Sequence, residues 1–319
     1  MSLKLAESPP TKVPAPAGTS IPLQGKRWSG RSRRDFVVFL ALALPNLVLI
    51  AVFTYMPLIS NAYYSTLNWT LGAASATVVG LGNYVTFFTG PDAPAVLGTT
   101  AVFTVATVGG SMLLGLLVAL ALNSKVRGTT FARSAVFAPY VLSGVGVGLV
   151  WLFIFDPGYG VLAWFFRGVG LESPQWINDP QLSLVMVILV YVWKNLGYCA
   201  VVFLAGLQSL PQDVMEAASL DGANGLRRFL SVSLPLLSPT TFFLLITTML
   251  SSLQAFDLIR IMTPLGTGTS TLIYEAYLQA FGAYNQAGYS AAISMVLFAV
   301  LLAITVLQLR FVEKKVHYA

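Results

Sequence analysis

The feature that most constrains this chain is a series of long apolar runs. A helix rises 1.5 Å per residue, so about 20 apolar residues are needed to cross the hydrocarbon core of a bilayer. Backbone polar groups in lipid must find partners within their own segment, and each run is therefore expected to be helical. The runs that reach this length cover residues 36–58, 96–122, 134–155, 182–207, 236–262 and 287–309. The sequence thus predicts an all-α, polytopic membrane protein with six transmembrane helices.

The composition agrees with a membrane location and argues against several classes of function. Only 9% of the 319 residues are charged, whereas a soluble domain carries about 25%. The single histidine, His317, and the single cysteine, Cys199, argue against a histidine-based metal site, a Ser-His-Asp triad and a disulfide framework. The sequence contains no G-x-x-x-x-G-K-[ST] segment, so it has no ATP site of the P-loop type. We expect neither a cofactor nor an enzymatic activity in this chain.

The basic residues are unevenly divided between the two sides of the membrane. If the chain crosses six times, most of its 18 Lys and Arg residues lie on the side of the N-terminus. These are Lys4, Lys12, Lys26, Arg27, Arg31, Arg33, Arg34, Lys125, Arg127, Arg133, Arg227, Arg228, Arg310, Lys314 and Lys315. Cytoplasmic loops are enriched in Lys and Arg, so both termini are expected in the cytoplasm. This bias explains the net charge of +6 without a nucleic-acid partner.

The same pattern divides the chain into four parts. Residues 1–34 are rich in Pro, Ala, Ser, Lys and Arg and are expected to form a disordered, basic cytoplasmic tail. Residues 35–95 hold the first span and an extracytoplasmic segment. Residues 96–309 form a core of five further spans, and residues 310–319 form a second cytoplasmic tail.

A polar segment, residues 209–239, separates the fourth and fifth apolar runs. Ser209, with Gln212 three residues later, fits a capping box, which predicts that a helix begins there. Gly222 is expected to end this helix in a left-handed conformation.

A second short helix is predicted over residues 226–232, ended by Pro235. Together the two helices would form a compact elbow outside the membrane, and we use the name elbow for residues 208–235. One side of it is nearly free of side chains, which would let another protein approach the backbone. The residues on that side are Ala217, Ala218, Gly222 and Ala223.

Three short motifs follow one another along the elbow. They are Glu216-Ala217-Ala218, Asp221-Gly222-Ala223 and Leu234-Pro235, and together they lie between two apolar runs. This arrangement resembles the EAA loop of permease subunits of binding-protein-dependent, type I ABC importers. In that family the loop is the coupling helix that docks onto the ATPase subunit. The plainer interpretation is an ordinary cytoplasmic helical hairpin with a glutamate on its solvated face.

The resemblance implies a type I permease fold in the cytoplasmic membrane of a prokaryote. It also implies three kinds of protein partner: a second homologous permease, an ATPase homodimer that binds ATP and Mg, and an extracytoplasmic substrate-binding protein. By the same resemblance, Glu216, Ala217, Ala218, Asp221, Gly222, Leu234 and Pro235 would couple the chain to the ATPase.

Two further segments narrow the resemblance. Residues 270–274, Ser-Thr-Leu-Ile-Tyr, and the tail 309–318 look like the Ugp-type A permeases. These permeases import sn-glycerol-3-phosphate or glycerophosphodiesters such as glycerophosphocholine. Related permeases import sugars, so a permease of a sugar or oligosaccharide importer is the alternative.

Polar residues within the spans are candidates for the substrate path. Charged side chains at membrane depth are costly and usually face a water-filled path or a partner. Lys194 lies near the middle of the fourth run, and Asp257 and Arg260 lie three residues apart on the fifth, where they can form an ion pair. Asn195 and Gln254 complete the set. An architectural role for Lys194, and structural pairing or snorkelling of Asp257 and Arg260, are the alternatives.

Two other classes of membrane protein compete with this interpretation. A secondary transporter often has inverted repeats and discontinuous helices. No convincing repeat relates the two halves of this sequence, and such a transporter does not need the elbow. A structural or assembly protein of the membrane is the other alternative, and it does not need the elbow either.

Overall fold

The computed structural model describes residues 30–123, 129–282 and 284–312. The predicted N-terminal tail lies almost entirely outside these residues. So do Lys125 and Arg127 of the first cytoplasmic loop and most of the tail that begins at residue 310.

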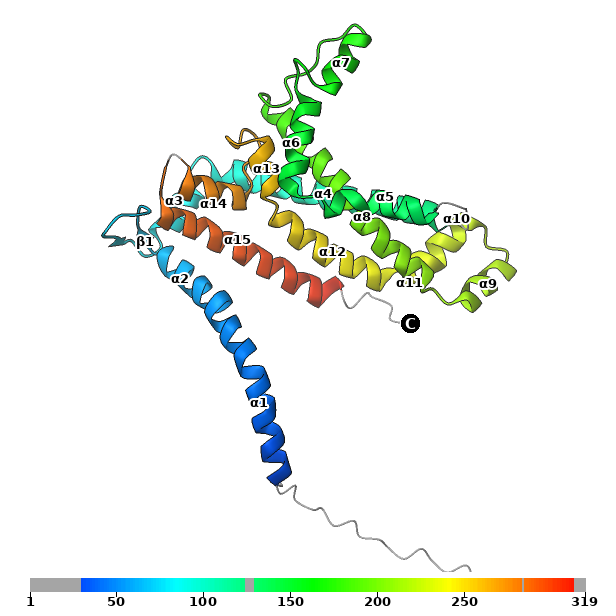
Figure 1. Ribbon diagram of the computed structural model, residues 1–319, viewed down its shortest axis with the longest axis horizontal. Coiled ribbons are helices and arrows are strands. Elements are labelled where there is room, and N and C mark those ends of the chain that lie inside the picture. The colour runs from blue at the N-terminus through cyan, green and yellow to red at the C-terminus, as the bar shows by residue number, and fades with distance from the viewer. Residues whose placement is uncertain (1–29, 124–128, 283, 313–319) are drawn as a thin grey trace, which may run out of the picture. The chain divides into compact units, whose positions relative to one another are not determined.

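Helices make up nearly all of the described structure (Figure 1). The helices, in which η marks a π-helical turn, are α1 (Gly30–Ile50), η1 (Ala51–Tyr55), α2 (Met56–Tyr64), α3 (Gly82–Thr89), α4 (Ala93–Leu122), α5 (Thr129–Val141), α6 (Gly144–Phe155), α7 (Val161–Gly168), α8 (Pro180–Gln208), α9 (Gln212–Leu220), α10 (Gly225–Arg228), η2 (Phe229–Ser233), α11 (Leu234–Leu236), α12 (Ser238–Leu253), α13 (Asp257–Met262), α14 (Leu272–Phe281), α15 (Ala287–Leu307) and η3 (Gln308–Val312). One antiparallel pair of two-residue strands, β1 (Leu67–Asn68) and β2 (Thr77–Val78), departs from the all-α prediction within the described residues.

By length and composition, five helical stretches of the described chain could cross a membrane. They are Arg34–Tyr64, Ala93–Leu122, Pro180–Gln208, Ser238–Met262 and Ala287–Arg310. The remaining predicted span, residues 134–155 and third in chain order, is not one straight helix. It consists of α5 and α6, which meet at a bend of 97°. If this pair is one broken span, the expected number of crossings is reached.

Local sequence explains the bend between α5 and α6. Pro139 has no amide hydrogen, and its ring crowds the preceding turn of α5. Ser143 has an extended ψ of 133°, and only two residues separate the end of α5 from Gly144, where α6 begins. Glycine has a low helix propensity, so Gly144, Gly146 and Gly148 favour a continuous helix only weakly.

The chain divides into two compact units, residues 1–57 and 58–319. The described part of the first unit is helical from Gly30, with a π-helical turn at Ala51–Tyr55. Pro57 follows this turn closely and cannot donate to the carbonyl four residues earlier. A wider turn at this point accommodates the missing hydrogen bond.

In the second unit, α4 and α8 pack side by side and run parallel. Gly110 faces Val192, and Gly115 faces Cys199, so the two helices advance in the same direction. A Cβ atom on Gly115 would lie 2.5 Å from the Cβ of Cys199. Small residues in the second apolar run thus allow the two helices to approach closely.

Other helices complete the core around this pair. A buried hydrogen bond of 2.7 Å joins the hydroxyls of Thr107 on α4 and Ser252 on α12. On α6, Gly148 lies against Ile261 of α13. The hydroxyl of Ser290 on α15 donates to the carbonyl of Ala276 on α14 over 2.6 Å. These contacts hold the break between α12 and α13 beside the break between α5 and α6.

Candidate functional site

A cavity of about 260 Å³ lies where these two helix breaks meet. Gly144 lines it from the start of α6, and Gln254, Ala255 and Phe256 line it from the segment that separates α12 from α13. Irregular backbone at membrane depth is tolerated where it borders a polar cavity or is covered by protein. Discontinuous helices of this kind commonly surround substrate sites in transport proteins.

Four of the five predicted substrate-path residues line this cavity. Lys194 and Asn195 reach it from α8, and Gln254 and Asp257 reach it from the α12–α13 break. The fifth predicted residue, Arg260, is not part of the lining. The cavity therefore contains one cationic and one anionic side chain on opposite elements, with two amides beside them.

Lys194 is anchored to the broken end of α5. Its Nζ donates to the carbonyl of Tyr140 over 2.8 Å and lies 5.4 Å from the centre of the Tyr140 ring. Carbonyls in the last turn of a helix lack intrahelical donors, and a lysine is favoured at this end of the helix dipole. Lys194 therefore stabilises the helix break, which is the architectural role considered from the sequence. Its ammonium still has two donors for other partners in the cavity.

The predicted ion pair between Asp257 and Arg260 is absent from the described structure. Asp257 begins α13, after the break, and lies against Gly144 of α6. The guanidinium of Arg260 instead lies over the ring of Tyr277, 4.6 Å from its centre, and 5.9 Å from that of Phe256. These cation–π contacts replace the expected carboxylate partner. Both residues lie on α13, so they remain one helical turn apart, but each side chain finds its partners on other elements.

A polar seam continues from the cavity into the core between α4, α8 and α12. It shares Tyr191 and Asn195 with the cavity, and its other residues are Thr107, Ser111, Tyr140, Tyr198, Thr248 and Ser251. The open volume here is only about 10 Å³. The hydroxyl of Ser111 is buried and makes no hydrogen bond in the described structure. A closely packed cluster of hydroxyl groups thus adjoins the cavity.

The elbow contains two helices joined by a tight turn, as the sequence predicted. Gly222 has a φ of +75°, which confirms the left-handed residue after α9. The amide of Ala223 donates to the carbonyl of Ala218 over 3.1 Å and closes the end of the helix. The side chain of Asn224 accepts from the amide of Arg227 over 2.9 Å and caps α10.

Two details of the elbow were predicted wrongly. Ser209 does not form a capping box, because it ends α8, and its hydroxyl donates to the carbonyl of Gly206 over 2.9 Å. Pro211 instead occupies the N-cap position of α9. The second helix does not stop at Pro235, which lies in the first turn of α11. A proline in a first turn removes no intrahelical hydrogen bond, so the backbone continues through η2 and α11 toward α12.

The elbow exposes acidic and apolar side chains together. Glu216, Ala217, Asp221 and Gly222 are exposed, Leu234 is 37% exposed, and Ala218 and Pro235 are half-buried. Leu220 at the tip is 89% exposed, and Leu226 is 70% exposed. Exposed apolar side chains grouped in this way are typical of a surface that binds another protein.

Comparison with known proteins identifies the family. The model of the family described as binding-protein-dependent transport system inner membrane component matches residues 111–318. The chain belongs to this family of ABC importer permeases. It is a multi-pass inner-membrane subunit and not itself an enzyme, because the permeases of this family leave ATP to a separate ATPase subunit.

Several permeases similar to this chain carry the same name, sn-glycerol-3-phosphate transport system permease protein UgpA. The protein from Agrobacterium fabrum is 37% identical over 280 residues, covering 87% of this chain and 95% of its own. The protein from Brucella abortus is 36% identical over 281 residues, with the same two coverages. The protein from Yersinia pestis is 34% identical over 280 residues, covering 87% and 94%.

Solved structures show that the fold is that of ABC importer permeases. A chain of a bacterial ABC transporter involved in the import of the acidic polysaccharide alginate matches with a TM-score of 0.76 and 20% identity, covering 88% of this chain and 96% of its own. A chain of the alginate transporter in complex with an alginate pentasaccharide-bound periplasmic protein matches with a TM-score of 0.77 and 20% identity, covering 88% and 95%. The predicted membrane-spanning helical permease fold is confirmed.

Sequence analysis missed several residues that line the permease cavity. Gly144, Tyr191 and Phe256 were not predicted there, although each lines it. A proline at 139 followed by a glycine-rich stretch was the available signal for the break between α5 and α6. No sequence signal marks the break before Asp257, because residues 254–256 contain neither proline nor glycine.

Proposed function

We propose that this permease moves a small phosphorylated cargo, sn-glycerol-3-phosphate or a glycerophosphodiester such as glycerophosphocholine, through the cavity at the helix breaks. The names of the similar permeases support the cargo class. Lys194 at the cavity and Arg260 beside it supply cations suited to a phosphate. A sugar or oligosaccharide is the second candidate cargo, favoured by the fold shared with the alginate importer.

The proposed importer has three further kinds of subunit. A second, homologous permease would complete the translocation path, an ATPase homodimer would bind ATP and Mg, and an extracytoplasmic binding protein would deliver the cargo. The similar alginate transporter, which was crystallised with a periplasmic protein, supports the last of these. Both termini of the chain would lie in the cytoplasm, in accord with the distribution of Lys and Arg. The elbow would then face the ATPase.

One observation carries the proposed mechanism: the helices that flank the elbow are those that form the cavity. From α8, which leads directly into the elbow, Lys194 and Asn195 reach the cavity. From the outer end of α12, which follows the elbow, Gln254 reaches it. Closure of the ATPase dimer on ATP would move the elbow as a rigid body and shift both walls of the cavity. Such a lever needs two states that nucleotide and loaded binding protein stabilise differently.

In this proposal, the exposed elbow residues make the contact with the ATPase. Glu216 and Asp221 offer carboxylates, Ala217, Ala218 and Gly222 offer a surface of small residues, and Leu220 offers an apolar side chain. Leu234 and Pro235 connect this surface to α12.

Reconstitution tests the proposal directly. The chain is placed in vesicles alone, with its candidate second permease and ATPase, and with the binding protein added. Uptake of labelled glycerol-3-phosphate, glycerophosphocholine and a disaccharide is then followed with ATP or with an ion gradient. We expect uptake of the phosphate esters only in the complete assembly and only with ATP. Uptake of the disaccharide in their place would assign the cargo to sugars, and ATP-independent uptake by the chain alone would contradict the coupling mechanism.

A further inference from the structure

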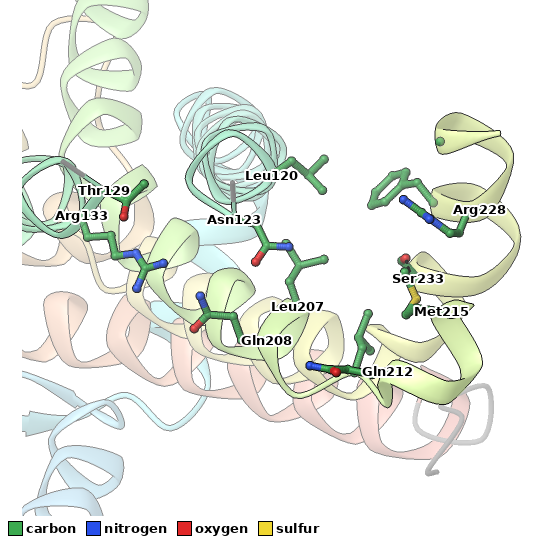
Figure 2. Close-up of a pocket in the computed structure, with 13 residues that line it drawn as sticks. Leu120, Asn123, Thr129, Arg133, Leu207, Gln208, Gln212, Met215, Arg228 and Ser233 are labelled. Atoms are coloured by element: carbon green, nitrogen blue, oxygen red, sulfur yellow. Dashed lines mark hydrogen bonds between the residues drawn. The ribbon is translucent and has the colours of Figure 1, made fainter. Parts of the chain in front are cut away.

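A second cavity, of about 580 Å³, separates the elbow from the ends of the membrane helices. Figure 2 shows its walls: α4, α5 and α8 lie on one side, and the elbow helices on the other. Its lining residues are Leu120, Asn123, Thr129, Arg133, Leu207, Gln208, Leu210, Gln212, Met215, Gly225, Arg228, Phe229 and Ser233. None of the residues that the proposed coupling surface uses is among them.

Among the described residues, the lining has two arginines and no carboxylate. Arg133 comes from α5, and Figure 2 shows its guanidinium directed toward Asn123 and Gln208. The Nε atom of Arg133 is buried and has no hydrogen-bond partner within the described structure. Arg228 comes from the elbow, and its Nη1 donates to the hydroxyl of Ser219 over 2.7 Å.

A buried guanidinium nitrogen without an acceptor is costly, and such groups in native proteins are normally satisfied. The amides of Gln208 on α8 and Gln212 on α9 add donors to the lining. The cavity is therefore built to receive an anion with several acceptor oxygens, and a phosphate group matches guanidinium donors well.

Large apolar side chains also line the cavity, alongside the polar Asn123, Thr129 and Ser233, and they favour a phospholipid over a free phosphate ion. Leu120, Leu207 and Phe229 stand beside the arginines, where they would meet the first carbons of acyl chains. The cavity also lies at the ends of α4 and α8, where the apolar spans terminate. Basic pockets between membrane helices on the cytoplasmic side are suited to anionic lipid headgroups.

We propose that this cavity binds the headgroup of an anionic phospholipid from the cytoplasmic leaflet, with Arg133 and Arg228 reaching the headgroup from opposite walls. The inference rests on the proposed function for one point, the cytoplasmic orientation of the elbow. The bound lipid bridges the helix bundle, through Arg133, and the elbow, through Arg228. Transmission from the elbow to the cavity at the helix breaks then depends on anionic lipid.

Lipid retention measures this binding without measuring transport. The transporter, purified with its partner subunits, is placed in nanodiscs of phosphatidylcholine with or without phosphatidylglycerol, and lipids that stay bound are counted by native mass spectrometry. Arg133→Gln and Arg228→Gln are compared with Arg227→Gln. Arg227 is the matched control because it is adjacent to Arg228, exposed and outside the cavity lining. Arg133→Lys serves as a second variant that keeps the charge.

We expect wild type and Arg227→Gln to retain phosphatidylglycerol in preference to phosphatidylcholine. Loss of one basic residue near a membrane surface should lower anionic-lipid retention about fivefold, and the two cavity variants should show this loss. Arg133→Lys should retain more lipid than Arg133→Gln.

Four results would overturn the inference. An equal loss in Arg227→Gln would indicate general surface attraction. Equal retention of the two lipids by wild type would exclude an anionic headgroup site. Displacement of the lipid by inorganic phosphate would assign the cavity to a soluble anion. Loss of the ATPase from Arg133→Gln with unchanged lipid would assign the arginine to a carboxylate of that subunit. Failure of uptake with normal lipid retention would instead count against the proposed function.

Discussion

Lys194 combines two tasks that a neutral residue could not perform together. Its ammonium donates to the carbonyl of Tyr140 at the end of α5, and it also forms part of the wall of the cavity opposite Asp257. A lysine that only stabilised a helix end would not need to reach a cavity. Arg260 differs, because two aromatic rings hold its guanidinium beside the cavity and leave its nitrogens without a carboxylate partner in the described structure.

Neutralising these cations tests their roles at the scale of single residues. Lys194→Gln and Arg260→Gln should each lower uptake of a phosphate ester about tenfold or more, because a hydrogen bond to a charged group contributes about 1.5–3 kcal/mol. Lys194→Arg should recover part of the uptake. The measurement is initial uptake rate, normalised to the amount of assembled transporter. Unchanged uptake in both neutral variants would assign Lys194 and Arg260 to packing alone.

At the scale of elements, the elbow is a rigid connector with an exposed tip. Its turn is closed by backbone hydrogen bonds and a side-chain cap, and the bond from Arg228 to Ser219 links α10 to α9. The connection to α12 is helical throughout, except at Leu237. A force applied at the tip would therefore reach α12 with little loss to bending.

Gly222 allows a test of this element. A Cβ atom there would meet nothing within 4 Å inside the chain, so Gly222→Trp should leave the fold intact apart from strain of about 1–2 kcal/mol at its φ of +75°. The indole would occupy the surface proposed for the ATPase. We expect Gly222→Trp to insert normally but to retain less ATPase on purification and to uncouple ATP hydrolysis from uptake.

Gly72 provides the matched control for backbone strain. Its φ is +85°, a Cβ atom there would also meet nothing within 4 Å, and it lies outside the elbow. Gly72→Trp should therefore show similar strain and normal ATPase retention. Normal uptake by Gly222→Trp would contradict the coupling role of the elbow.

At the scale of the whole molecule, the direction of the helices is consistent with six crossings. Because α4 and α8 run in the same direction, the chain must cross back an odd number of times between them. The bent pair α5–α6 supplies one such crossing. The turn at Tyr159 and the elbow then lie on opposite sides of the membrane. Tyr159 is 85% exposed, and Glu216 is also exposed.

Site-directed labelling tests this orientation. Cys199 is buried against α4, so Cys199→Ala gives a background without thiols. In that background, a membrane-impermeant maleimide should label Tyr159→Cys in intact cells and Glu216→Cys only after permeabilisation. The chain is expressed without partner subunits so that nothing shields the elbow. Labelling of Glu216→Cys in intact cells would place the elbow outside and remove its proposed role.

Composition and periodicity determined the class of this protein because lipid imposes strict conditions on sequence. A bilayer requires long apolar helices, and the elbow carries its motifs within one local segment. Helical spans, the left-handed Gly222 and four of the nine residues that line the cavity could therefore be predicted from sequence.

Only the tertiary structure decided how those residues meet. The breaks after Val141 and before Asp257 are stabilised by neighbours distant in the sequence, such as Lys194 on α8. Asp257 and Arg260 lie one turn apart on the continuous helix α13. Asp257 nevertheless lies against Gly144 of α6, and the aromatic rings of Phe256 and Tyr277 take the place of the carboxylate beside Arg260. Spacing along a helix shows which of its side chains could meet, but other elements decide which contacts form. Where backbone hydrogen bonds are exchanged for contacts between helices, the outcome depends on packing across the whole bundle.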